Sequence, residues 1–151
     1  MNETPNGFQF QLFRQFTFQT NDQVLSCFFN ELASQNINIT GYMQAKEANG
    51  INFVKVVVGT PSTQTASDLE TTRSVLRSLG VKNREYDIIQ VFGFPPVTPG
   101  VLNTLFGALW CKVNVKAMYV GEESLIFIDV NDIKKALRTL NQSVLKRCPT
   151  D

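Results

Sequence analysis

The segment Thr98–Leu102 carries residue types that suit the binding of a small anion. Thr98 is a good helix N-cap, and Pro99 suits a first helical position because its missing N–H would have no partner there. A helix N-terminus offers unpaired N–H groups and the positive end of the helix dipole, which both favour a carboxylate. Gly100 has no Cβ, so a ligand or another chain can approach its backbone closely. Helix initiation without any ligand is the alternative interpretation of the same residues.

A second group of candidate residues lies where the next strand is predicted to begin. Asn114 stands there and could bind an ammonium or amide group. An earlier segment, Asn21–Leu25, has the same pattern, and Asn38 begins the strand that follows it. The candidate ligand-binding residues are Thr98, Pro99, Gly100, Val101, Leu102 and Asn114, with Asp22, Gln23 and Asn38 in the earlier segment.

Catalytic and metal-binding chemistry is poorly represented in this sequence. Histidine is absent, which removes the commonest general base, the Ser-His and Cys-His nucleophile pairs, and the commonest metal ligand. The carboxylates considered for an acid–base role are scattered and mostly occupy predicted cap positions: Asp22, Asp68, Asp87, Asp129 and Asp132. We therefore expect no catalytic residues, no metal and no cofactor, and predict that the chain is not an enzyme.

The three cysteines are odd in number and widely separated, with no CxxC spacing. Neither a zinc site nor a disulfide framework is predicted from them. Cys27 and Cys111 lie in apolar helical stretches and are expected to be small buried side chains. Cys148 is expected to be an exposed thiol, near a tail that is disordered after Lys146.

The composition of the chain limits its classes of partner. Its 151 residues suffice for one domain or two small fused ones, and 43% of them are hydrophobic. The net charge of +1 argues against a general nucleic-acid binder and lowers the electrostatic barrier to self-association. No apolar run approaches the roughly 20 residues of a membrane helix, and the first residues do not resemble a signal peptide. We expect a cytoplasmic protein that binds neither nucleic acid nor membrane.

Apolar residues with a period of two predict the strands. The longest such pattern consists of Phe8, Phe10, Leu12, Phe16 and Phe18. We interpret this aromatic face as covered by helices, with a platform for stacking bases as the alternative. Residues 37–58 are predicted to form a hairpin that turns at Asn49-Gly50, and further strands are predicted at 86–94, 113–120 and 125–130.

Apolar residues with helical spacing predict four helices between these strands. Ser67 and Glu70 are predicted to form a capping box for the second helix, which Gly80 is predicted to end. The third helix carries one apolar stripe made of Leu102, Leu105, Phe106, Leu109 and Val113. Arg73, Arg77, Lys82 and Arg84 give a basic edge that we interpret as a solvated helix face and turn, with a small anionic ligand as the alternative.

The order of these elements repeats, since strand, helix, hairpin and helix occur twice at an offset of about 76 residues. Phe16-Thr17-Phe18 aligns with Phe92-Gly93-Phe94, and Ile37-Asn38-Ile39 aligns with Val113-Asn114-Val115. Two βαββα units of antiparallel strands, each with two helices on one face, predict the α+β class.

On these residues the sequence resembles the ACT-domain family, whose members are small ferredoxin-like modules that typically bind amino acids and regulate an associated enzyme. The resemblance rests on Thr98–Leu102 with Val113-Asn114-Val115, and on Asn21–Leu25 with Ile37-Asn38-Ile39-Thr40. It implies tandem ACT-like repeats at residues 14–82 and 86–145. Asp22-Gln23 replaces the Pro-Gly pair usual in the family, which favours the second repeat as the ligand site. Neither repeat has a fourth strand of its own, so residues 86–94 either close the first repeat or open the second.

The resemblance implies a regulatory module that binds an amino acid, catalyses nothing itself and acts as a homodimer or higher oligomer. The chain contains no enzyme domain, so such a module would act alone or on a partner. A structural homo-oligomerisation module without a ligand is the alternative, and an enzyme of ferredoxin-like type is a third hypothesis.

Overall fold

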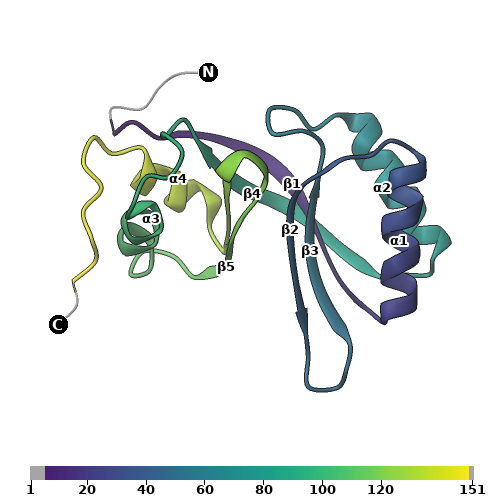
Figure 1. Cartoon of the computed structure of the whole chain (residues 1–151). Helices are drawn as coiled ribbons and strands as arrows, with labels where there is room; N and C mark the ends of the chain where they lie inside the picture. The colour runs from purple at the N-terminus through teal and green to yellow at the C-terminus, as the bar shows by residue number, and fades with distance from the viewer. Residues whose placement is uncertain (1–5, 150–151) are drawn as a thin grey trace. The chain divides into compact units, whose positions relative to one another are not determined.

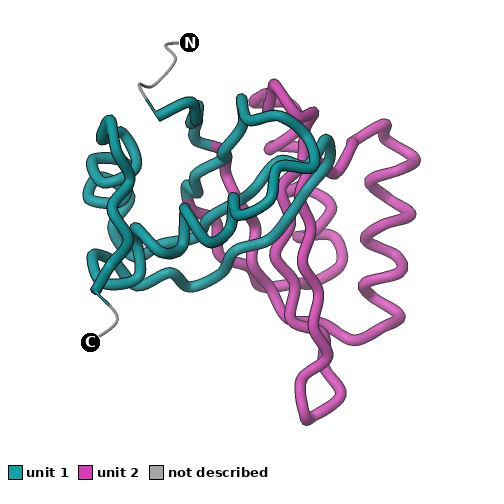
Figure 2. The backbone as a smooth tube through the Cα atoms, turned by 60° about the vertical axis from the view of Figure 1, so that its left-hand side comes forward, with its two compact units in different colours: residues 1–12, 87–151 teal, residues 13–86 magenta. Residues whose placement is uncertain are grey.

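The computed structural model describes residues 6–149, so most of the segment Met1–Gly7, expected to be a loose lead-in, lies outside the described residues. The chain forms two compact units: unit 1 comprises residues 1–12 and 87–151, and unit 2 comprises residues 13–86 (Figure 2). The elements, shown in Figure 1, are β1 (Gln9–Thr20), α1 (Asp22–Ser34), β2 (Ile39–Lys46), β3 (Asn52–Val58), α2 (Ala66–Ser78), β4 (Asn83–Phe92), α3 (Val101–Leu109), β5 (Val115–Val120), the 3₁₀ turn η1 (Glu122–Ser124), β6 (Ile126–Val130) and α4 (Ile133–Leu140).

Unit 2 packs two helices on one face of antiparallel strands. β3 pairs with both β1 and β2, and Phe16 lies opposite Val56 in the β1–β3 register. Since side chains alternate between the faces of a strand, Phe16 and Phe18 of β1 share one face with Val54, Val56 and Val58 of β3, and this face packs against residues of α1 and α2. The core of unit 2 consists of Phe16, Phe18, Leu25, Phe28, Leu32, Val54, Val56, Val58, Val75 and Leu76.

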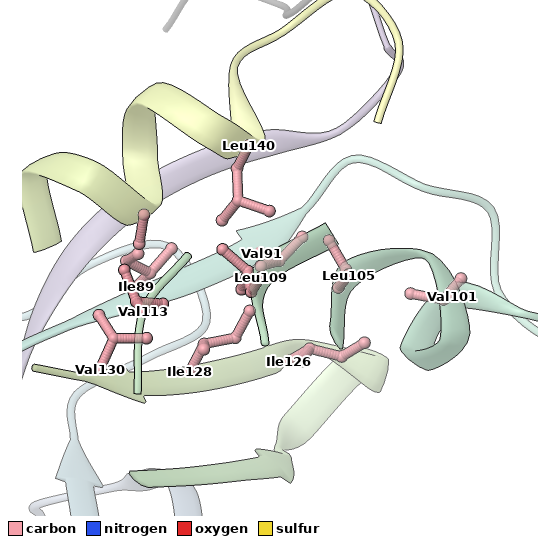
Figure 3. Close-up of a cluster of buried hydrophobic side chains, with 11 residues drawn as sticks. Ile89, Val91, Val101, Leu105, Leu109, Val113, Ile126, Ile128, Val130 and Leu140 are labelled. Atoms are coloured by element: carbon pink, nitrogen blue, oxygen red, sulfur yellow. The ribbon is translucent and has the colours of Figure 1, made fainter. Parts of the chain in front are cut away.

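Unit 1 repeats this arrangement with α3 and α4. β6 pairs antiparallel with β4 and with β5, and Ile89 lies opposite Ile128. The core of unit 1, drawn in Figure 3, consists of Ile89, Val91, Val101, Leu105, Leu109, Val113, Ile126, Ile128, Val130, Ala136 and Leu140.

The hydrogen-bonded order of the strands is β2-β3-β1-β4-β6-β5. The boundaries of the two units fall inside β1 and β4, so unit 1 includes the start of β1 and unit 2 includes the start of β4. In unit 1, Phe8 packs edge-on against Phe94 with 5.8 Å between the ring centroids, and the Gln11 side chain donates to the Gln90 side chain. In unit 2, Arg14 Nε donates to Glu85 Oε1 at 3.1 Å. Each unit thereby contains a fourth strand segment, and β4 contributes to both units.

The architecture confirms the predicted α+β class, with an antiparallel sheet and ferredoxin-like βαββα units. The predicted repeat boundaries, 14–82 and 86–145, stay a prediction. Among residues 6–149, no helix has the length and the apolar character needed to cross a membrane.

The ends of the helices differ in part from those expected. α1 is capped by Asn21, and α4 by Asp132, one of the carboxylates expected at cap positions. The cap of α2 is Thr65 in place of Ser67: its hydroxyl accepts from the Asp68 N–H while the Asp68 carboxylate accepts from the Thr65 N–H. The sequence offers both pairings, Thr65 with Asp68 and Ser67 with Glu70, and the helix uses the earlier one.

All three cysteine predictions are wrong. Cys27 is exposed because the buried face of α1 follows Leu25, Phe28 and Leu32, and a residue two positions after Leu25 points away from that face. Cys111 and Cys148 form a disulfide, and Cys148 is buried. The Cys148 N–H donates to the Gly107 carbonyl at 2.6 Å, so the described part of the tail is bound to α3.

Candidate functional site

The start of α3 differs from the start predicted for it. The Thr98 hydroxyl donates to the Pro95 carbonyl oxygen at 2.5 Å and therefore does not cap the helix. Gly100 is the N-cap, with a left-handed backbone at φ +85°, and the helix begins at Val101. Pro99 therefore precedes the cap. Glycine suits this position because other residues adopt a left-handed backbone only at a cost in energy.

The N-terminus of α3 is open. No side chain among the described residues caps it, whereas Asn21, Thr65 and Asp132 cap the other three helices. The first intrahelical hydrogen bond runs from the Thr104 N–H to the Gly100 carbonyl at 2.9 Å. The three N–H groups before Thr104 therefore have no acceptor within the helix. A Cβ placed on Gly100 would meet nothing within 4 Å. This end of α3 can therefore receive a carboxylate.

The matching segment of unit 2 is occupied by its own side chains. The Asn21 side chain accepts from the Val24 N–H at 2.8 Å and fills the cap position of α1. The Asp22 carboxylate accepts hydrogen bonds from the Lys46 ammonium and from Asn52 Nδ2, the latter at 2.7 Å. These bonds, with Lys46 the larger cause, lower the pKa of Asp22 below its ordinary value. Gln23 is exposed beside them.

Asn38 and Asn114 occupy equivalent places just before β2 and β5. Asn38 Nδ2 donates to the Gly59 carbonyl at 2.8 Å, so its amide connects the beginning of β2 to the end of β3. In unit 1 the beginning of β5 is connected to the end of β6 by a different side chain, that of Asn131, which accepts from the Asn114 N–H at 2.9 Å. The Asn114 side chain instead lines a hollow of about 470 Å³ that also contains Phe106 and Trp110.

Unit 1 does not bring Thr98–Leu102 and Asn114 together. α3 separates them, and its nine residues span about 13 Å at 1.5 Å per residue. Figure 3 shows Val101 and Val113, which lie near these two places, at opposite sides of the core cluster. A ligand smaller than the helix cannot contact both places in one unit.

A further hollow of about 500 Å³ lies on α3 and was not predicted from the sequence. Leu102 and Phe106, expected on the buried stripe of the helix, are 48% and 46% exposed, while Leu105 and Leu109 are buried. The available signal was the spacing of four residues that joins Leu102, Phe106 and Trp110 into a second stripe.

The basic edge in unit 2 is partly neutralised. Arg73 forms ion pairs with Glu70 and Glu85. Arg77, Lys82 and Arg84 are exposed, as expected of a solvated face. Within residues 6–149, no three side chains of the His, Cys, Asp and Glu types are grouped so that they could hold a metal ion.

No protein-family model and no curated protein sequence matches this chain. Solved structures do resemble it. Protein BT0572 from Bacteroides thetaiotaomicron matches with a TM-score of 0.65 at 18% identity, over 85% of this chain and 86% of that protein. The regulatory subunit of aspartate kinase from Thermus thermophilus, in its ligand-free form, matches with a TM-score of 0.59 at 19% identity, over 87% of this chain and 93% of that one.

Aspartokinase III from E. coli, solved in complex with lysine and aspartate, also matches. Its TM-score is 0.59 at 16% identity, and the match covers 97% of this chain and 35% of that enzyme. At these identities the matches establish a shared fold. The likeness of this chain to the ACT family and to aspartate kinase regulatory subunits is therefore structural.

Proposed function

We propose that this chain is a regulatory module that binds an amino acid or a similar small zwitterion and has no catalytic activity of its own. The observation that carries the proposal is the open N-terminus of α3 at Gly100. The structural neighbours support it, because they include a regulatory subunit and an enzyme solved with lysine and aspartate.

The carboxylate of the ligand is proposed to lie against the N–H groups at the start of α3. These groups and the helix dipole attract an anion, and Gly100 has no side chain in the way. Unit 2 is proposed not to bind a carboxylate at its matching segment, because Asn21 fills the cap and Asp22 adds a negative charge.

The ammonium group is proposed to bind Asn114 from a second copy of the chain. Asn114 lies at the other end of α3, about 13 Å from Gly100 by helix length, and its amide oxygen can accept from an ammonium. A homodimer that places the α3 start of one copy beside Asn114 of the other would complete the site.

The expected cytoplasmic location stays a prediction, and the disulfide is a feature more common in oxidising compartments.

A thermal-shift screen of the amino acids tests the proposal. A ligand that binds only the folded state at a hundred times its Kd raises the free energy of unfolding by about 2.7 kcal/mol. The best ligand is then titrated by calorimetry into Gly100→Asp, which should abolish binding. Gly100→Ala is the matched control, because it also places a side chain on the left-handed backbone but adds neither a charge nor a capping group, and Gln23→Ala should bind normally. Equal affinity of the wild type and Gly100→Asp would place the site elsewhere.

Association without a ligand is the second candidate function. It is favoured by β5, which ends the strand order and carries Val120 at 56% exposure. A screen without any stabilising amino acid, together with a dimeric mass in light scattering, would support this function over the first.

A further inference from the structure

α3 exposes an apolar stripe along its length. Leu102, Phe106 and Trp110 follow one another at intervals of four residues and are 48%, 46% and 45% exposed. They border the hollow of about 500 Å³ between α3 and β5, to which Met118 contributes from β5. We call this hollow the α3 groove. Its volume falls in the range of small-molecule sites, and its walls are largely apolar.

One charged side chain, that of Arg147, lines the α3 groove. None of the ion pairs among residues 6–149 uses this guanidinium. Arg147 Cγ would lie 3.3 Å from a Cβ on Gly107, so the absence of a side chain there lets Arg147 lie closely on α3. A guanidinium that has no ion pair with a described residue and lies beside an apolar surface complements a carboxylate attached to a hydrocarbon body.

The disulfide holds Arg147 in this place. The next residue, Cys148, is bonded to Cys111 just after the end of α3, and its N–H donates to the Gly107 carbonyl at 2.6 Å. The tail from Gln142 to Cys148 has no helix or strand of its own. Its position against α3 therefore depends on these contacts and on the packing of Leu145 on the core of unit 1.

We propose that the α3 groove binds an apolar monocarboxylate, whose hydrocarbon body lies on Leu102, Phe106 and Trp110 and whose carboxylate pairs with Arg147. A zwitterion fits less well, because none of the described residues that line the groove has a carboxylate for an ammonium group, and the ammonium would lie near the Arg147 cation. This ligand class and this place differ from those of the proposed amino-acid site at Gly100.

Binding in the α3 groove is coupled to the redox state of the tail. A dithiol that reduces the Cys111–Cys148 bond leaves two thiols and is itself oxidised to a disulfide. The covalent connection that holds Arg147 beside the groove is then lost, so the reduced protein binds the carboxylate more weakly.

Trp110 is the one tryptophan of the chain and lines the groove, so its fluorescence reports on binding directly. The probe is 4-phenylbutyrate, with 4-phenylbutanol as the uncharged probe of the same shape. We expect saturable binding of the acid, weakened about tenfold by Arg147→Gln because a charge-assisted hydrogen bond is lost. Lys146→Gln removes an equal charge from the neighbouring residue outside the groove and should leave the affinity unchanged. The alcohol should bind the wild type and Arg147→Gln equally.

Reduction of the folded wild type should weaken binding of the acid to the level of Arg147→Gln. Equal effects of Arg147→Gln and Lys146→Gln, or no saturable change in fluorescence, would overturn the groove as a carboxylate site. Unchanged affinity after complete reduction would overturn the role of the disulfide. Gly100→Asp should bind 4-phenylbutyrate normally, so a failure of this proposal is distinguishable from a failure of the amino-acid site.

Discussion

Arg73 on α2 donates a hydrogen bond from Nε to Oε2 of Glu85 at 2.9 Å. The Glu85 side chain is 18% exposed and also accepts from Arg14 on β1. The hydrogen bonds from Arg73 lower the pKa of Glu85 from its ordinary 4.5; burial opposes this effect and Arg14 adds to it. A carboxylate with a lowered pKa in the folded state stabilises the fold above its ordinary pKa, and this stabilisation is lost as the pH falls through the lowered value.

Glu85→Gln should therefore reduce the free energy of unfolding near neutral pH and make it less dependent on pH below about 4.5. The loss at neutral pH should be about 1 kcal/mol or less, because both arginine partners remain partly solvated. Urea denaturation across the acid range measures both effects. Glu123→Gln, which removes an exposed carboxylate, is the control, and equal pH profiles for the two variants would contradict the prediction.

The disulfide should contribute to the stability of unit 1. Replacing Cys111 and Cys148 together by Ser should lower the free energy of unfolding by about 2–4 kcal/mol, since the bond closes a loop over a separation of 37 residues. Chemical denaturation under oxidising conditions gives the value. Cys27→Ser, at the exposed free cysteine, should have little effect. A double variant as stable as the oxidised wild type would show that the bond does not stabilise the fold.

The cap of α2 can be tested with two neighbouring substitutions. Thr65→Ala should destabilise the protein by about 1 kcal/mol, because the Asp68 N–H loses its acceptor. Ser67→Ala alters the residue that the sequence pattern favours as the cap, but the structure gives that side chain no capping role, so the change should be close to neutral. Thermal unfolding of both variants decides between the two caps. The reverse order of effects would mean that the helix begins at the later position.

Phe8 should stabilise unit 1, although it lies far from the rest of that unit in the sequence. Phe8→Ala should lower the free energy of unfolding by about 2 kcal/mol, because the partly buried ring packs on Phe94 and on the core of unit 1. Hydrogen exchange should show the loss of protection in α3 and α4 and not in α1. Leu12→Ala, at a side chain 46% exposed, is the control. Equal losses in α1 and α3 would argue against this assignment.

The elements that depend on local pattern could be predicted from the sequence. The alternating apolar residues of β1 and the left-handed Gly80 after α2 are found where the sequence places them. Such features are set by a few neighbouring residues, so a short window contains the required information.

Features that depend on distant residues could not be predicted in this way. Cys111 and Cys148 pair because the tail returns to α3, and no local signal marks that return. The exposure of Phe106 likewise depends on how α3 is rotated against its sheet, since two apolar stripes compete on this helix. At the candidate site, the residue types were read from the sequence, but their separation by the length of α3 became clear only in three dimensions.

Unit 2 is continuous in the chain, whereas unit 1 is built from two segments on either side of it. A ribosome therefore releases all of unit 2 once residue 86 has emerged, while Phe8 and Phe10 still lack the core on which they pack. At about 5–20 residues per second, the remaining residues up to α4 take roughly 3–10 s to follow. During that interval the apolar start of β1 is available to a chaperone or to a neighbouring nascent chain, so Phe8 and Phe10 reach their final partners later than the residues of unit 2 that follow them in the chain.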